Sequence, residues 1–583
     1  MTSTEPTAVN ERPADALSAT ERAALDTVVS DLAAGETHWA TLSLTARSAL
    51  LGAVAVTVAA QAERWVQVAA LAKGLDRDSP LVGEEWLSGP YVVLTNLATL
   101  RGSIAAIDRG ESPLRNTRFG RAPGGRVTVP VLPGTPFEAL LLHGFSAEAW
   151  LEPGVTEEEA RSRAGLGQRH PSRTGGVGLV LGAGNISAIP PLDVLYELIA
   201  HNRVSVLKLN PVLDALAPVY TDAFAPLIEA GLLAIVSGGA AVGGYLAHHE
   251  GVSHVHITGS AATHDVVVFG PGAEGRARRA AGTPLLRKPI TSELGGVAPI
   301  IVLPGKWTSR DLTFQAEHVA TQRLHNGGYN CIAGQVVVLS RDWPQKAAFL
   351  AALRVALAAA PARPPWYPGS DARVRDALAA YPGATRLGPD GGRLLIEAGT
   401  ADPAALIGVE AFAPVLGVIE LPGTGQAFLD AAVTAANEDF LGTLGANILG
   451  TPATIRRLGP GFAAALERLR YGTIAVNAWT AMGFLTAAAP WGAFPGHSMA
   501  DVQSGIGVVH NAFLLADTER TIVRGPFRPF PRSVWHGEFA LFPKPPWFVS
   551  ARSAAKTTRL MTEFVSHPSW WKAPAIFLSA FRA

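Results

Sequence analysis

Apolar positions divide the chain into a helical N-terminal part and a longer part in which strands and helices alternate. Residues 18–73 form an Ala- and Leu-rich run without proline, and a second run, 90–106, follows the helix-breaking pair Ser79-Pro80. Between residues 118 and 154, short Val and Leu runs alternate with Gly and Pro turns. This pattern predicts an N-terminal helical layer followed by a β-rich segment.

In the rest of the chain, predicted strands alternate with predicted helices, as is typical of a parallel sheet. Short apolar runs with the length of buried strands occupy residues 176–181, 204–207, 233–236, 254–258, 300–303, 335–339, 415–421, 446–449 and 472–476. Stretches with helical spacing, such as 191–200 and 219–230, lie between them. We therefore predict two α/β domains, each built on a mainly parallel sheet.

Composition excludes several classes of protein. Of the 583 residues, 48% are hydrophobic and 16% are charged, which excludes disorder for most of the chain. The 48 basic residues are balanced by 48 acidic ones, so the protein lacks the overall positive field of a nucleic-acid-binding protein. We expect no nucleic acid among its partners.

Three further patterns bear on the cellular compartment of the protein. The first thirty residues lack the apolar core of a secretory signal and carry Glu5, Glu11, Arg12, Asp15, Glu21, Arg22 and Asp26. No run of eighteen uninterrupted apolar residues occurs, so we expect no membrane-spanning helix. A single cysteine excludes an internal disulfide and fits a reducing compartment. We predict a cytoplasmic protein.

The one cysteine, Cys331, lies in a glycine-flanked stretch, HNGGYNCIAGQ, at residues 325–335. The stretch follows a predicted helix that ends near Leu324 and precedes the strand that starts at Gln335. Backbone N–H groups surround a thiol in such a turn, and glycines leave room for a ligand. A lone cysteine is more often a buried inert residue, so the neighbouring motifs decide between the two interpretations.

Seven segments follow one another along the chain: LGAGNISAIPP around Asn185, VLKLNP around Lys208, HITGS ending at Ser260, SELGG around Glu293, NGGYNCIAG around Cys331, EAFAPV from Glu410, and GTIAVN ending at Asn477. In this order they resemble the NAD(P)-dependent aldehyde dehydrogenase superfamily. Asn185 and Lys208 lie 23 positions apart, which matches the family's spacing between its oxyanion asparagine and its cofactor lysine. The resemblance extends from about Gly176 to Gly507.

The resemblance implies an α/β fold with two parallel-sheet domains, a small oligomerisation element and a C-terminal extension. Its segments are 1–117 for the N-terminal helical part of the cofactor domain, 118–170 for a β-rich bridging or oligomerisation segment, 171–290 for the Rossmann-like NAD(P)-binding domain, 291–500 for the catalytic domain, and 501–583 for an oligomerisation strand followed by an aromatic, basic extension. Members of this family commonly assemble through a strand near the C-terminal end, so we expect a homodimer or homotetramer.

Oxidation of an aldehyde requires these residue types on chemical grounds. A thiolate adds to the aldehyde carbon, and the resulting oxyanion needs donors such as the Asn185 amide and the Cys331 backbone N–H. Water must then hydrolyse a thioester, and a carboxylate such as Glu293 can act as the general base. Taken singly, Asn185 could be a turn residue and Glu293 a helix-capping carboxylate; taken together, the candidates favour a catalytic site.

The resemblance also implies a set of cofactor-binding residues for NAD or NADP. Lys208 contacts the ribose on the adenine side, and Glu410 and Phe412 hold the nicotinamide ribose and ring. Gly259 and Ser260 complete the set. No metal is predicted: His248, His249, His254, His256 and His264 cluster in the sequence, but no carboxylate lies among them at the spacing of metal ligands.

Three departures from the family pattern stand out. Many members carry a glutamate three residues after the cofactor lysine, where this chain has Pro211, and losing that carboxylate favours NADP. The tryptophan usual before the oxyanion asparagine is Gly184, which predicts a wider substrate tunnel. A longer basic stretch between residues 260 and 290 is interpreted as a solvated surface loop rather than a part of the cofactor site.

Two alternatives to simple aldehyde oxidation stay open at this point. A CoA-acylating relative would pass the acyl group to coenzyme A and could reduce acyl-CoA, but such relatives generally lack the glutamate found here as Glu293. A non-catalytic or membrane-associated protein could keep the fold, although the retained candidate residues oppose a dead site. The sequence does not identify which small-molecule aldehyde is the substrate.

The C-terminal end differs in composition from the rest of the chain. Residues 520–583 hold ten basic and two acidic side chains, an excess of eight positive charges, among several Trp and Phe. The favoured interpretation is that these aromatic residues pack on their own or a neighbouring subunit. The competing one is peripheral contact with an anionic membrane, which suits interfacial tryptophans beside positive charge.

Overall fold

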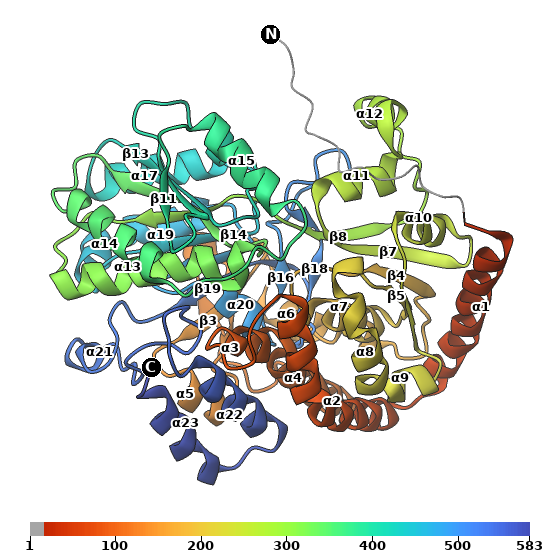
Figure 1. The fold of residues 1–583 in the computed structure, drawn as a ribbon. Helices are drawn as coiled ribbons and strands as arrows, with labels where there is room; N and C mark the ends of the chain where they lie inside the picture. Colours follow the sequence, from red (N-terminus) through yellow and green to blue (C-terminus); the bar gives the residue numbers. More distant parts are fainter. Residues whose placement is uncertain (1–16) are drawn as a thin grey trace.

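The structure is a computed structural model that describes residues 17–583, and two sheets organise it (Figure 1). One sheet has six strands and the other has eleven. The fold is therefore α/β with two large sheets, as the sequence predicted. The charged residues Glu5, Glu11, Arg12 and Asp15, which bear on the signal-sequence prediction, lie outside the described residues.

The six-stranded sheet lies on the right in Figure 1 and has the order β17-β8-β7-β4-β5-β6. Its strands are β4 (Val177–Leu181), β5 (Val204–Lys208), β6 (Leu233–Val236), β7 (Val252–Gly259), β8 (Ile290–Leu294) and β17 (Gly505–Ile506). The chain runs outward from β4 to β6 and then returns to place β7 on the other side of β4. Open parallel sheets bind ligands at such a reversal, beyond the carboxyl ends of the strands.

Strand β8 corrects the predicted domain boundary at residue 290. It pairs in parallel with β7, and Thr258 lies opposite Glu293. The first sheet therefore continues through Leu294, and Glu293 belongs to its last parallel strand. The sequence conceals this strand because three polar residues, TSE, follow its first isoleucine.

Helices cover both faces of this sheet. They are α1 (Ala19–Thr41), α2 (Leu44–Ala72), α4 (Val92–Asp108), α7 (Ile189–His201), α8 (Ala217–Ala223), α9 (Ala225–Glu229) and α10 (Ala240–His248). The predicted helical run 18–73 is two helices, because Ser43 takes extended backbone angles and caps α2 by accepting a hydrogen bond from Ala46 N–H. Gly35 lets α1 approach closely, since a Cβ there would lie 1.8 Å from the Gly231 carbonyl oxygen.

Helix α2 is long and apolar enough by length and composition to cross a membrane, with a mean hydropathy of 1.3 in its best window. This differs from the expectation based on uninterrupted apolar runs. One stripe of the helix, with Leu51, Val54, Val58 and Trp65, is buried in the protein core. Its buried Arg47 also donates hydrogen bonds to other parts of the chain, so length and composition are weak evidence for a membrane span.

The eleven-stranded sheet has the order β1-β2-β3-β19-β15-β14-β9-β10-β13-β12-β11, and its last strand, β11, is Thr385–Leu387. Its central strands are parallel: β9 (Ala298–Val302), β10 (Gly334–Ser340), β12 (Arg393–Glu397), β13 (Val415–Leu421), β14 (Gly445–Leu449), β15 (Thr473–Val476) and β19 (Thr518–Arg524). Two separate apolar cores cover its faces. One core includes α17 (Gly425–Glu438) and α19 (Pro460–Arg468), and the other includes α13 (Ser309–Leu324) and α14 (Lys346–Ala359).

Strand β19 joins this sheet to the β-rich segment. The segment supplies β1 (Gly120–Arg121), β2 (Val127–Leu132) and β3 (Ser146–Leu151). β19 pairs in parallel with β15 on one edge and antiparallel with β3 on the other, all within one chain. Both edges of the strand that the family resemblance linked to assembly are thus occupied, and the homodimer or homotetramer stays a prediction.

The C-terminal extension packs on its own chain, as the favoured interpretation held. It contains α21 (Arg532–Trp535), α22 (Ala554–Ser566) and α23 (Ala573–Ala580), and Figure 1 shows α22 beside α3 (Val82–Trp86). The contact is close because Gly83 has no side chain, and a Cβ there would lie 2.7 Å from the backbone carbon of Ala554. Part of the excess positive charge is paired internally, for example between Lys544 and Glu317.

Candidate active site

Cys331 occupies the turn between α13 and β10, as the sequence predicted. The turn begins with the short helical segment His325–Gly328. Asn326 and Gly327 have positive φ angles of 55° and 72°, which Asn and Gly tolerate best. The chain reverses there and presents the cysteine between the two sheets.

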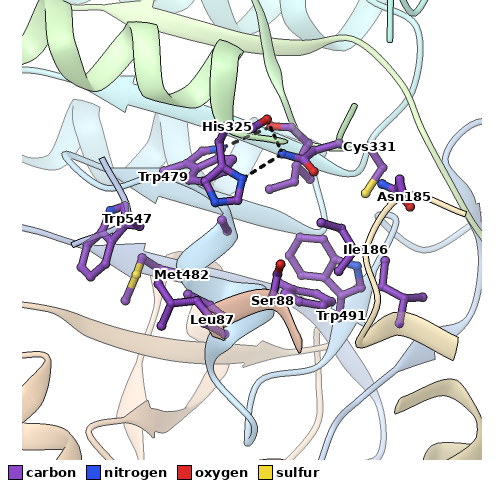
Figure 2. A pocket seen from close by; sticks show the side chains of 16 residues that line it. Leu87, Ser88, Asn185, Ile186, His325, Cys331, Trp479, Met482, Trp491 and Trp547 are labelled. Atoms are coloured by element: carbon purple, nitrogen blue, oxygen red, sulfur yellow. Dashed lines mark hydrogen bonds between the residues drawn. The ribbon is translucent and has the colours of Figure 1, made fainter. Parts of the chain in front are cut away.

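Asn185 lies against this turn. It follows β4, and its side-chain Nδ2 donates a hydrogen bond to the Tyr329 carbonyl at 2.9 Å. In return, Asn326 Nδ2 donates to the Asn185 carbonyl at 3.0 Å. The two loops are therefore locked together, and within residues 17–583 the second N–H of the Asn185 amide has no hydrogen-bond acceptor. Figure 2 shows Asn185 next to Cys331.

Glu293 is buried close to the cysteine. Burial and the negative charge of Asp193 raise its pKa to about 7, against the opposing effects of Cys331, His256 and Trp491. Its Oε1 atom is buried without a hydrogen-bond partner in the described part of the chain. A half-ionised carboxylate with a free oxygen is suited to accept a proton from a water molecule.

The thiol itself is neutral in this environment. Burial and then the negative charge of Glu293 raise the pKa of Cys331 well above its usual range. A thiol of this kind must lose its proton before its sulfur can act as a nucleophile.

The histidines that cluster in the sequence support β8. His254 Nε2 and His256 Nδ1 each lie 2.9 Å from the Thr291 hydroxyl oxygen. His256 also lies 3.5 Å from the buried Asp193 carboxylate. No group of three or more His, Cys, Asp and Glu side chains suited to a metal occurs in the region 17–583. These histidines anchor the strand that carries Glu293.

A buried ion network holds the cysteine turn from behind, and no pattern in the sequence indicates it. Lys73 Nζ lies 2.9 Å from Glu85 Oε1 and 3.1 Å from Asn326 Oδ1. Glu84 accepts a hydrogen bond from the Asn326 backbone N–H and pairs with Arg363. Arg363 comes from the Pro-rich loop 361–368, so this exposed loop also contributes a buried anchor to the site.

A large cavity of about 2300 Å³ opens at the carboxyl ends of β4, β5 and β7. All eight predicted site residues line it: Asn185, Lys208, Gly259, Ser260, Glu293, Cys331, Glu410 and Phe412. Tyr367 and Arg373, which the sequence did not single out, also line it. The cavity therefore lies at the reversal of strand order and reaches the cysteine.

Glu410 shows that this cavity is built for a polar ligand. Its Oε1 atom is buried and has no hydrogen-bond partner among the residues described. Burial raises its pKa to about 8. Gly295 makes room for it, because a Cβ there would lie 2.0 Å from that oxygen. A buried carboxyl without a partner is costly unless a ligand hydroxyl completes its hydrogen bonds.

Two expectations about departures from the family pattern are wrong. Gly184 does not widen the apolar side of the site, because it lines the large cavity and the Asn210 side chain fills the space beside it; a Cβ would lie 2.6 Å from Asn210 Cγ. The stretch 260–290 is not a solvated loop. It forms α11 (Ala261–Phe269) and α12 (Gly272–Ala281), and its residues Thr263, Val267 and Leu285 line the large cavity.

A second, apolar cavity reaches Cys331 from the other side. It encloses about 600 Å³, and Figure 2 shows the side chains that line it. Cys331 and Asn185 line both cavities. The lone cysteine therefore stands where a large, partly polar cavity meets an apolar one.

This fold and site define a two-domain α/β protein with its one cysteine between two cavities. Residues 160–372 match the family model described as the aldehyde dehydrogenase family. This part of the chain is therefore similar to the aldehyde dehydrogenase family.

The curated relatives match over a short segment. The 4-trimethylaminobutyraldehyde dehydrogenases of Mus musculus and Rattus norvegicus are each 41% identical to this chain over 87 residues. That segment spans 15% of this chain and 15% of each relative.

Solved structures share the fold over most of the chain. An aldehyde dehydrogenase of Mycobacterium tuberculosis, complexed with NAD+, aligns with a TM-score of 0.57 and 18% identity over 86% of this chain and 90% of its own. An NADP-dependent glyceraldehyde-3-phosphate dehydrogenase of Bacillus halodurans, complexed with NADP, aligns with a TM-score of 0.57 and 19% identity over 87% and 92%. Aldehyde dehydrogenase C of Pseudomonas syringae, a mutant complexed with NAD+ and octanal, aligns with a TM-score of 0.56 and 20% identity over 87% and 90%.

Proposed function

We propose that this protein oxidises an aldehyde to the carboxylic acid with NAD or NADP, through a thioester on Cys331. The observation that carries the proposal is the position of Cys331 between two cavities, with Asn185 and Glu293 beside it. The apolar cavity suits the aldehyde, and the large cavity suits the cofactor. The match of residues 160–372 to the aldehyde dehydrogenase family model supports the same reaction class.

Cys331, Asn185 and Glu293 have separate roles in the proposed reaction. The Cys331 thiol gives up its proton to water, and the sulfur adds to the aldehyde carbon. The free N–H of the Asn185 amide and the Cys331 backbone N–H donate hydrogen bonds to the oxyanion. After the thioester forms, Glu293 removes a proton from the attacking water. Its buried position with an unpartnered oxygen supports hydrolysis over transfer of the acyl group to coenzyme A.

The cofactor supplies one step, acceptance of the hydride from the bound substrate. Glu410, with its unpartnered oxygen, would hold hydroxyls of the nicotinamide ribose, and Phe412 would pack beside the ring. Lys208 would hold the ribose at the adenine end. Gly259 and Ser260 would line the cavity between the adenine end and the nicotinamide end of the cofactor. The fit rests on the position of the cavity at the strand-order reversal.

NADP should bind at least as tightly as NAD. Pro211, at the start of the short helix Pro211–Leu216, offers no carboxylate to the adenosine ribose and no negative charge to repel a 2′-phosphate. Calorimetric titration of the protein with each cofactor measures the preference. A strong preference for NAD would mean that another group replaces the missing carboxylate.

The steady-state rate should rise about tenfold between pH 6 and pH 8, because Glu293 must be ionised to act as a base. Its pKa is raised to about 7, so the carboxylate form predominates only above that pH. Rates measured at saturating aldehyde and cofactor test this. A profile that is flat across this range would exclude Glu293 as the base.

A panel of aldehydes, tested with NAD and with NADP and with and without coenzyme A, examines the proposed function directly. We expect NAD(P)H to form without coenzyme A and the free acid to accumulate. Product that forms only with coenzyme A would assign the protein to the acylating relatives. No NAD(P)H under any condition would contradict the proposal.

Peripheral contact with a membrane stays a prediction. The extension keeps apolar side chains in solvent, including Trp571, which is 93% exposed, and Trp535, which is 74% exposed. Together with the excess positive charge, these side chains predict sedimentation with anionic vesicles at low salt. Vesicles of neutral lipid are the control. A protein that stays in the supernatant with both would contradict membrane contact.

A further inference from the structure

The apolar cavity is a passage that runs from the nucleophile to the C-terminal extension. In Figure 2, Cys331 and Asn185 lie at one end of the lining residues and Trp547 lies at the other. Leu87, Ile186, Met482 and other apolar side chains line the space between the ends, as do Trp479 and Trp491. No Lys, Arg, Asp or Glu side chain lines it.

Two polar side chains of the passage, Ser88 and Asn330, already have partners. The Ser88 hydroxyl donates to the Glu84 carbonyl at 2.7 Å, and Asn330 Nδ2 donates to the His325 carbonyl at 3.1 Å. Burial lowers the pKa of His325, so its ring is neutral at physiological pH. A ligand in this passage meets an uncharged, apolar wall until it reaches the cysteine.

Trp547 is held rigidly, although it comes from the appended part of the chain. Its neighbour Phe548 stacks on Phe314 and His318 of α13, with ring centroids 5.3 Å and 5.4 Å apart. The Val549 backbone N–H donates to the Thr321 hydroxyl of the same helix. Because α13 leads directly into the cysteine turn, the same helix positions both the C-terminal extension and Cys331.

A third cavity lies behind Trp547. It encloses about 450 Å³ and is lined by extension residues such as Phe542 and Pro545 and by His143. Trp479 and Trp547 are the two residues that line both this cavity and the apolar passage. The two indole rings therefore form a partition, and more space lies beyond it.

We propose that Trp547 of the C-terminal extension is a specificity-determining residue that limits the length of the substrate, and that the substrate is an aldehyde with an uncharged, apolar tail. The inference rests on the proposed function for the identity of the reacting group. The tail lies along the passage and ends against the partition. Removing the Trp547 ring joins the passage to the cavity behind it and admits a longer tail.

The test uses the single cysteine and needs no turnover. Unreactive alkanamides from butanamide to decanamide are tested for protection of Cys331 against alkylation by iodoacetamide, followed by mass spectrometry. In the unchanged protein, each added methylene should strengthen protection about fourfold until the tail meets Trp547, after which longer amides gain nothing. In Trp547→Ala this limit should move to an amide longer by two or more carbons.

Trp571→Ala is the matched control, because Trp571 belongs to the same extension and is exposed to solvent. It should keep the limit of the unchanged protein. Trp547→Leu removes the ring but keeps an apolar side chain, so it tests the same shift if the alanine variant fails to fold. The proposal is overturned if the foldable Trp547 variant keeps the original limit.

Two further measurements distinguish a failure of the apolar-tail assignment from a failure of the proposed function. An amide with a trimethylammonium end should protect less than a neutral amide of equal length; stronger protection would mean that the aromatic wall binds a cation and would overturn the apolar-tail assignment. The kcat/KM values for butanal to decanal should follow the amide series. If no aldehyde is oxidised while protection still shifts in the Trp547 variant, the proposed function fails and the length limit stands.

Discussion

Replacing Cys331 with alanine should reduce aldehyde oxidation by at least about 10³-fold, because the variant cannot form the covalent intermediate. The change removes one sulfur atom and leaves the hydrogen bond between the Asn185 amide and the Tyr329 carbonyl, which holds the turn through backbone and amide atoms. The fold and the large cavity should therefore be unaffected. Steady-state assays of NAD(P)H formation measure the loss.

Cofactor binding is the control for this variant. Titration of Cys331→Ala with NAD and NADP should give affinities close to those of the unchanged protein. Cys331→Ser offers a second comparison, since its hydroxyl is a far weaker nucleophile at neutral pH and should be nearly as inactive. Oxidation at a near-normal rate by the alanine variant would contradict the covalent mechanism.

Glu293→Gln should give one rapid turnover and then nearly stop. The first NAD(P)H appears before the thioester is hydrolysed, so the variant should release about one per active site and then slow by about 10²–10⁴-fold relative to the unchanged protein. Glutamine keeps the shape of the buried side chain but cannot accept a proton. Rapid-mixing absorbance measurements resolve the two phases.

The trapped intermediate gives an independent check on this variant. Mass spectrometry should find an acyl group on Cys331, the single cysteine of the chain, after the first phase. Hydroxylamine, which attacks thioesters without a protein base, should release it. Steady turnover without a first phase would assign the base to another residue.

Much of the fold follows from apolar patterns in the sequence. The run 415–421 is strand β13 at those bounds, and 233–236 is β6. Strands that are buried on both faces read as continuous apolar runs, which is why these elements are recognisable. Strand β8 escapes this pattern because Thr291, Ser292 and Glu293 are polar. Their burial depends on β7 and its histidines, which lie far away in the sequence.

The candidate site also has parts that the sequence indicates and parts that only the structure shows. Motifs with fixed residue types, such as the segments around Asn185 and Cys331, are recognisable from the order of residues alone. The ion network behind the cysteine turn is not, because Glu84 and Arg363 lie 279 positions apart and carry no motif. Trp547 likewise reads in the sequence as one aromatic residue of an extension, and its position in the apolar passage depends on how that extension folds back.

The position of β19 has a consequence for how this chain meets a second copy of itself. The strand already sits between β15 and β3 of its own chain, so a partner could take its place only by exchanging the same strand. Such an exchange creates no new hydrogen bonds, and its equilibrium depends on the effective concentration of the strand within its own chain against the concentration of the partner. A short connection keeps that internal concentration in the millimolar range, far above the micromolar concentration of a typical protein sample. The eleven-stranded sheet should therefore stay complete when the protein is diluted, because each molecule supplies β19 from its own chain.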